Sequence, residues 1–188
     1  MKRLILIVAV LAIMGFITQA EAAPTDTCGM SVTVSVTASV SVTDEPLAFT
    51  PAVAAGSSDV TDTGCTVTND GSAYNYYKLK ITAKPATWTV EETAGSVDWN
   101  EFRLLALFTS TTNPGTGAFD TADDIVKQSA ETTASSTAYA ITAEGASVKG
   151  YDCTKTAVRK LWFRFDAPSG TDLTTQQWIT VTVYAYQT

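Results

Sequence analysis

Few residues in this sequence could do acid–base or nucleophilic chemistry. None of the 188 residues is a histidine, and histidine is the usual proton shuttle near neutral pH. This excludes Ser-His-Asp and Cys-His catalysis and zinc sites that need imidazole. Paired carboxylates could still hydrolyse glycosides, and the candidates are Glu91, Glu92, Asp98 and Glu101. No partner in the sequence fixes their geometry, so we expect solvated charges and no enzymatic activity.

Three acidic residues gather beside a glycine-containing turn in the segment "NPGTGAFDTADD". They are Asp120, Asp123 and Asp124, and hard oxygen ligands close together in a loop suit calcium. Their spacing does not match an EF-hand. We interpret them first as solvated turn residues, with a weak calcium site in an extracellular domain as the alternative.

The three cysteines, Cys28, Cys65 and Cys153, are 37 and 88 residues apart, so they form no CxxC motif. In an exported protein one disulfide can form and one thiol is left over. The sequence does not decide which pair closes. We favour a buried, inert position for the remaining thiol over a bond between two chains.

The N-terminus has the pattern of a secretory signal peptide. Lys2 and Arg3 precede an apolar run from Leu4 to Ile17, and small residues flank Glu21, as at an A-x-A cleavage site. The run is shorter than the roughly 20 residues of a spanning helix. We therefore expect residues 1–22 to be a signal peptide and residues 23–188 to be one domain, secreted, periplasmic or at the cell surface. No later segment predicts a membrane span.

The charge of the predicted mature chain limits its partners. Removal of residues 1–22 leaves 10 basic and 18 acidic residues, a net charge of −8. Nucleic acid and anionic membrane surfaces are poor partners for that charge. We therefore expect no nucleic-acid binding.

The composition and periodicity of the mature region predict an all-β protein. It has 31 threonines and 14 serines, and its apolar residues recur at a spacing of two. About eight or nine strands in an antiparallel sandwich with Greek-key links, immunoglobulin-like or jelly-roll-like, fit this pattern, with a closed barrel as the second choice. Beyond the opening strand, the expected strands are 65–69, 74–83, "ATWTVEE", "DWNEFRLLALFTS", "DDIVKQ", "STAYAIT", "KTAVRKLWFRFD" and "QQWITVTVYAYQT".

The last two of these strands predict an exposed aromatic strip. If they pair as antiparallel neighbours, their outward residues form one row, made of Trp162, Arg164, Trp178, Tyr184 and Tyr186. A surface on which arginine caps an indole is the plainest interpretation. An interface with another subunit and a sugar-stacking platform are the alternatives.

The segment "SVTVSVTASVSVT", residues 31–43, predicts a long opening strand with one apolar face. Its branched residues are Val32, Val34, Val36, Val40 and Val42. At roughly 3.3 Å per residue the segment is longer than most strands. We expect it to cross its own sandwich, and as the sharper hypothesis it adds to an open sheet edge of a neighbouring subunit.

Two stretches carry a resemblance to known families. The run "CTVTNDGSAYNYYKLKITA" resembles the hairpin of bacterial extracellular immunoglobulin-like modules. "VSVTDEPLAFTP", a following cysteine-bearing strand and the final "ITVTVYAY" are similar to archaic chaperone-usher pilins and their spore-coat relatives. That resemblance implies a non-catalytic subunit of a surface fibre or coat. Cys65 lies at the start of its strand rather than at its end, so the family's disulfide is not carried over.

Taken together, these patterns predict a non-enzymatic exported surface, coat or fibre subunit, or an interaction module. Self-association or binding to other surface proteins is the expected partnership. A carbohydrate-binding module with a glycan ligand is the alternative function, and a calcium-stabilised extracellular domain is the third.

Overall fold

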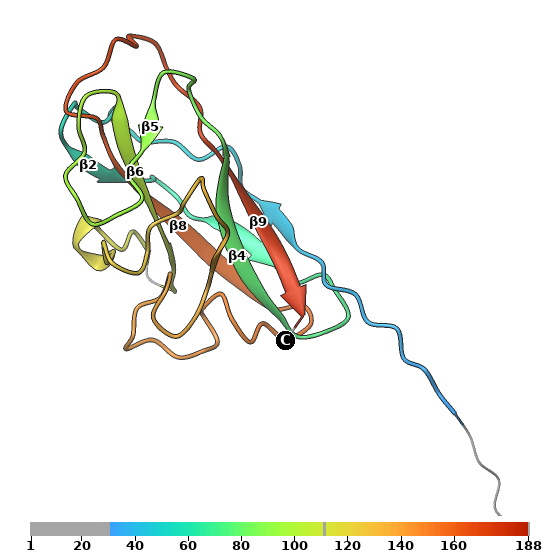
Figure 1. The fold of residues 1–188 in the computed structure, drawn as a ribbon. Coiled ribbons are helices and arrows are strands. Elements are labelled where there is room, and N and C mark those ends of the chain that lie inside the picture. Colours follow the sequence, from blue (N-terminus) through green and yellow to red (C-terminus); the bar gives the residue numbers. More distant parts are fainter. Residues whose placement is uncertain (1–30, 111, 188) are drawn as a thin grey trace, which may run out of the picture. The chain divides into compact units, whose positions relative to one another are not determined.

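The computed structural model describes residues 31–110 and 112–187. The chain divides into two units, Met1–Val34 and Ser35–Thr188, and the second holds all the regular structure of the described residues (Figure 1). The predicted signal peptide and Cys28 lie outside the described residues. The strands are β1 (Ser41–Thr43), β2 (Ser58–Val60), β3 (Cys65–Thr68), β4 (Asn75–Ala83), β5 (Thr89–Val90), β6 (Glu101–Phe108), β7 (Thr132–Thr133), β8 (Val158–Asp166) and β9 (Thr180–Gln187), with a 3-10 turn η1 (Thr116–Ala118).

The strands form two sheets, which confirms the predicted all-β sandwich. The larger sheet has the order β1-β3-β8-β6-β5, with β2 also paired to β8, and the smaller has the order β7-β4-β9. All pairings are antiparallel except that of β5 with β6. The described residues contain no α-helix. Burial of alternating apolar side chains between two sheets is the arrangement that a spacing of two predicts.

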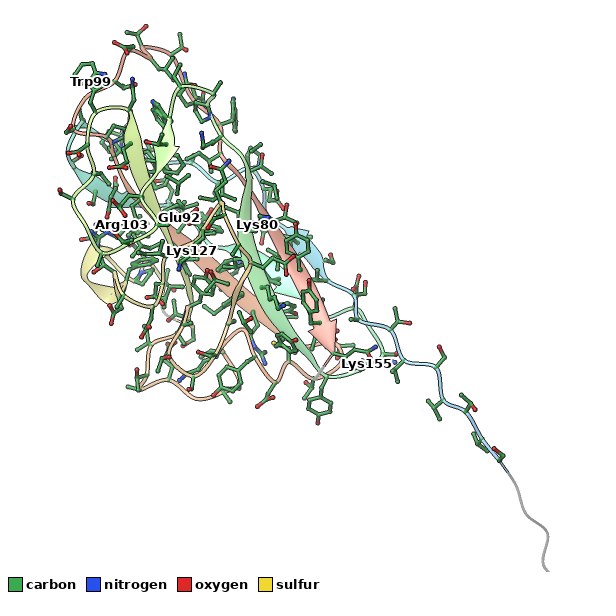
Figure 2. All side chains as sticks on the ribbon, viewed as in Figure 1. Lys80, Glu92, Trp99, Arg103, Lys127 and Lys155 are labelled. Carbon is green, nitrogen blue, oxygen red and sulfur yellow. The ribbon has the colours of Figure 1, made fainter. Side chains whose placement is uncertain are left out.

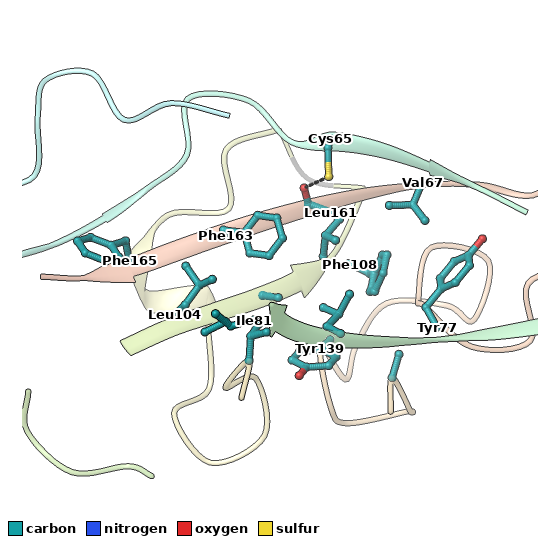
Figure 3. Packing of buried hydrophobic residues seen from close by; sticks show 14 of the residues in the cluster. Cys65, Val67, Tyr77, Ile81, Leu104, Phe108, Tyr139, Leu161, Phe163 and Phe165 are labelled. Atoms are coloured by element: carbon teal, nitrogen blue, oxygen red, sulfur yellow. Dashed lines mark hydrogen bonds between the residues drawn. The ribbon is translucent and has the colours of Figure 1, made fainter. Parts of the chain in front are cut away.

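Strand β6 is apolar on both faces because both faces are covered. All its residues from Phe102 to Phe108 are buried, as the run "EFRLLALF" predicts for a central strand. One row, which includes Leu104 and Phe108, lies in the main core with Leu79 of β4 and Phe163 of β8. Figure 3 shows this packing between the strands.

A second apolar cluster covers the outer face of the larger sheet. Leu105 and Leu107 of β6 and Trp162 of β8 pack there with Phe119 and Ile125, which lie in the chain between β6 and β7. The larger sheet is therefore covered on its outer side over β6 and the middle of β8. This explains why Trp162, which was predicted to lie in the outward row of β8, is buried.

Some predicted pairings are wrong. The run "CTVTNDGSAYNYYKLKITA", which resembles a hairpin, does not form one: Asp70 and Gly71 lie between β3 and β4, and these two strands belong to different sheets. The predicted strands "DDIVKQ" and "STAYAIT" make only isolated bridges, from Ile125 to Leu105 and from Ala140 to Phe108. Both segments hydrogen-bond to the backbone of β6 over a few residues, with Ile125 in the outer cluster and Val126 and Tyr139 in the main core.

A buried ion pair fastens the loop before β6 to the larger sheet. Arg103 donates from Nε and Nη2 to the Asp166 carboxylate at 2.8 and 2.6 Å, and from Nη1 to the backbone oxygens of Thr93 and Gly95. Arg164 donates to the other Asp166 oxygen at 2.7 Å. Figure 2 labels Arg103 on the sandwich. The carboxylate thus holds two guanidinium groups, one of them buried.

The buried side chain of Asn69 connects three segments. Its amide nitrogen donates to the carbonyls of Ala73, Cys153 and Thr154 at 2.8–3.0 Å. Its oxygen accepts from the Gly71 N–H at 3.0 Å and from the Asn75 amide at 2.8 Å. One amide therefore joins the turn between β3 and β4 to the chain at Cys153 and Thr154.

Candidate interaction surface

Strand β9 is the open edge of the smaller sheet. It pairs with β4 from Asn75–Gln187 to Ala83–Thr180, and no other strand of the described residues pairs with it. An edge strand presents a row of unpaired backbone N–H and C=O groups that can bind a further strand.

The core beneath β9 is incompletely covered. The inward residues Val181 and Val183 contact the core, yet both are only partly buried. In the neighbouring strand β4, the inward residues Tyr77, Leu79 and Ile81 are 0–1% exposed. The apolar row at the edge of this sheet is therefore accessible from the side where no strand lies.

The outward face of β4 and β9 carries an aromatic and charged group. Tyr76 and Tyr186 stack with ring centroids 5.7 Å apart, and the Lys78 ammonium lies 3.9 Å from the Tyr186 ring centroid. The Tyr186 hydroxyl donates to Glu131 at 2.7 Å, and this hydrogen bond raises the pKa of Tyr186. Tyr184 is opposite Lys78 in the register. Tyr184 and Tyr186 thus share a surface with the outward residues of β4. Tyr76 and Lys78 are two residues apart in the sequence, and this spacing indicates that they lie on the same face of the strand.

The predicted strip of Trp162, Arg164 and Trp178 is not assembled. Strands β8 and β9 lie in different sheets, so the residues are not neighbours across a ladder. Trp162 is 6% exposed within the outer apolar cluster, and Arg164 pairs with Asp166. Trp178 is 61% exposed in the segment before β9. The prediction was wrong because it paired β8 with β9. These strands are consecutive in the chain but belong to different sheets.

The opening segment is a strand only at its end. β1 covers Ser41–Thr43, paired with Thr66–Thr68 of β3, and Val40 and Val42 pack against the core. Val32, Val34 and Val36 are 71%, 76% and 49% exposed. The expectation that all five valines are buried in one crossing strand is therefore wrong. A strand requires hydrogen bonds to a partner strand, and only three residue pairs form between this segment and β3.

Hydrogen bonds mark where the opening segment joins the sandwich. The Thr37 N–H donates to the Ser72 hydroxyl at 2.8 Å, and the Ser72 N–H donates to the Thr37 carbonyl at 3.0 Å. The Asn75 amide donates to the Ser39 carbonyl at 3.0 Å. A Cβ at Gly71 would collide with the Thr37 carbonyl oxygen, so this close approach requires glycine. Residues 31–36 precede the joined part, and we call them the arm.

Cys65 and Cys153 are buried free thiols. Burial, assisted by the charge of Glu45, raises the pKa of Cys65 to about 12, and burial also raises the pKa of Cys153. Neither is reactive as a thiolate at neutral pH. The two thiols are not bonded to each other, and a bond with Cys28 lies outside the described residues.

The three predicted calcium ligands do not assemble into a metal site. The buried Asp124 carboxylate accepts the N–H groups of Asp120 at 2.8 Å and Tyr139 at 2.7 Å. Among residues 31–110 and 112–187, no group of three or more Asp, Glu, Cys or His side chains is placed to hold a metal ion, so Asp123 completes no cluster. Asp124 instead joins two loops by accepting backbone hydrogen bonds.

Asp124 gives the protein a specific pH dependence. Burial raises its pKa from 3.8 to about 7, although the N–H bonds of Asp120 and Tyr139 oppose that shift. The unfolded chain releases this proton at lower pH than the folded chain does. Its contribution to stability is therefore complete below about pH 3.8 and lost as the pH rises through about 7, and it amounts to a few kcal/mol.

We expect Asp124→Asn to abolish this contribution. The difference in unfolding free energy between wild type and variant should fall steadily from pH 4 to pH 7.5, measured by urea denaturation at each pH. Asp123→Asn, at an exposed carboxylate next in the chain, is the control and should leave the profile unchanged. A wild-type-minus-variant difference that stays flat across this range would show that Asp124 is ionised throughout.

The candidate catalytic carboxylates are engaged separately. Glu91 accepts from the Thr93 backbone and hydroxyl, and Glu92 accepts from the backbones of Gln128 and Ser129. Burial raises the pKa of Glu92, but the hydrogen bonds from Ser129 and Gln128 outweigh it and lower the pKa overall. These bonds serve loop structure. Glu101 likewise accepts the Asp98 N–H at 3.0 Å, which caps the turn into β6.

The fold and the surface define a class: a two-sheet β-sandwich with an open edge strand and an exposed apolar arm. No family model, curated protein or solved structure matches the chain. No helix of the described residues is long and apolar enough to cross a membrane.

Proposed function

We propose that this chain is an exported, non-enzymatic subunit that joins further copies of itself by strand addition, in a surface, coat or fibre assembly. The observation that carries this proposal is the edge of β9. Its outer backbone edge is not paired with any strand of the described residues, and its apolar row is only partly buried. These are the two features that a strand-accepting edge needs.

The arm has the chemistry of the strand that would be added. Val32, Val34 and Val36 alternate with Ser and Thr, so in extended form they share one face. Six residues span about 20 Å at 3.3 Å each, most of the length of β9. The valines would complete the row of Val181 and Val183, and their burial would stabilise the contact by roughly 1.5 kcal/mol or more each.

This proposal predicts that Val34→Asp abolishes self-association. A carboxylate at the middle inward position would have to be buried without a partner. We expect the wild-type mature chain to form oligomers or fibres, and the variant to remain monomeric, in size-exclusion chromatography with light scattering and in negative-stain microscopy.

Thr33→Asp is the matched control. It introduces the same charge one residue away, on the opposite face of an extended arm, and should leave association nearly unchanged. Equal loss in both variants would indicate charge repulsion instead of strand addition. A wild-type chain that stays monomeric at every concentration would overturn the proposal.

A further inference from the structure

Trp99 is an exposed indole that packs against Gly170. Its side chain is 60% exposed. A Cβ at Gly170 would collide with Cζ3 and Cε3 of the indole, so the ring lies where only glycine leaves room. Figure 2 shows Trp99 at one end of the sandwich, far from Lys155 at the other. The Cζ3–Cε3 part of the indole therefore packs against the Gly170 backbone, and more than half of the residue stays open to solvent.

The backbone around the indole is fixed. Trp99 forms a parallel bridge with Gly170, and the Asn100 N–H donates to the Gly170 carbonyl at 2.9 Å. The Asn100 side chain donates to the Asp172 carboxylate at 3.1 Å, and its oxygen accepts from the backbone N–H of Asp172 at 3.3 Å. Binding of a ligand to this ring would therefore lose little conformational entropy, because the backbone that carries the ring is already ordered.

The groups beside the ring are polar acceptors. Asp98 precedes Trp99 in the chain, Asp172 is hydrogen-bonded to Asn100, which follows it, and both carboxylates are exposed. An indole face carries partial negative charge and attracts the partially positive C–H groups on one side of a sugar ring. Carboxylates accept hydrogen bonds from the hydroxyls at its rim. Anionic ligands are disfavoured by the two carboxylates and the net charge of −7.

We propose that Trp99 and the exposed carboxylates of Asp98 and Asp172 form a binding site for a neutral saccharide, independent of the β9 edge. An apolar protein partner fits less well, because the ring has charged neighbours where an interface centre would have further apolar side chains.

The test is a titration of the full mature chain with neutral oligosaccharides, a panel of α- and β-linked glucose, galactose and mannose oligomers, followed by tryptophan fluorescence and calorimetry. We expect millimolar or tighter binding by at least one oligomer, weakened about tenfold or more by Trp99→Ala. Gly170→Ala should weaken binding as well, because the new methyl displaces the ring. Trp178→Ala removes a tryptophan of equal exposure and is the matched control, which should bind like wild type.

Three results would overturn the site: no binding by any oligomer up to about 10 mM, binding that Trp99→Ala leaves intact, or binding of choline in place of sugars, which would indicate a cation site. Circular dichroism verifies that each variant is folded. Saccharide binding that persists in the monomeric Val34→Asp variant would show that this site and strand addition are separate.

Discussion

Replacing Asp166 with alanine is expected to lower the free energy of unfolding by about 3–5 kcal/mol. Asp166 is 3% exposed and Arg103 is 8% exposed, so the substitution leaves a buried guanidinium without its counter-ion. It also frees the loop that Arg103 holds through the carbonyls of Thr93 and Gly95. Urea denaturation measures the effect.

The control for this prediction is Asp123→Ala, which removes an exposed carboxylate and should change stability by less than about 0.5 kcal/mol. The double variant Arg103→Ala/Asp166→Ala should be more stable than the sum of the two single losses implies, because no unpaired charge from this pair remains. Additive losses would show that the two side chains do not act as a pair.

The second large effect is expected for Asn69→Ala, a loss of about 3 kcal/mol or more. The substitution leaves the buried Gly71 N–H and the Ala73 carbonyl without the hydrogen bonds that Asn69 makes, and it removes one of the two donors to the Cys153 carbonyl. Burial without a partner costs about 1–3 kcal/mol for each such group. Thermal and urea unfolding give the magnitude.

Asn69→Asp separates the two halves of the amide, since it keeps an acceptor for Gly71 and loses the three donated bonds. It should also be strongly destabilising, whereas Asp70→Ala in the same turn, at an exposed site, should be nearly neutral. If Asn69→Ala lowers the free energy of unfolding by less than about 1 kcal/mol, water replaces the amide and the hydrogen bonds of Asn69 are not required for the structure.

The strands themselves could be predicted from the sequence because their signal is local. Alternating Tyr77, Leu79 and Ile81 define β4, and the continuous apolar run of β6 predicted burial on both faces. Which strands become neighbours depends on contacts distant in sequence, so the assumed pairing of β8 with β9 was wrong. Trp162 followed the predicted parity, but loop residues such as Phe119 cover it, and no local pattern indicates a cover on an outer face.

The candidate surfaces were predictable to different extents. The outward Tyr184 and Tyr186 follow from parity alone. The exposure of Val32, Val34 and Val36 does not, because parity gives them a shared face but not whether a neighbouring strand covers it. The indole of Trp99 does not, because its role depends on Gly170, more than 70 residues further along the chain. The structural role of Asn69 was missed for the same reason. A turn-forming "NDG" sequence does not indicate that its asparagine donates hydrogen bonds to the carbonyls of Cys153 and Thr154.

Strand addition at β9 is tested most directly by amide hydrogen exchange. The sample is the full mature chain carrying Val34→Asp, to which a synthetic peptide of residues 30–38 with the wild-type sequence is added. We predict that the β9 amides that do not face β4 exchange rapidly without the peptide and become protected with it, while the same peptide carrying Asp at position 34 protects none. Unchanged β9 exchange at saturating wild-type peptide, or protection that appears only on other strands, would contradict the account.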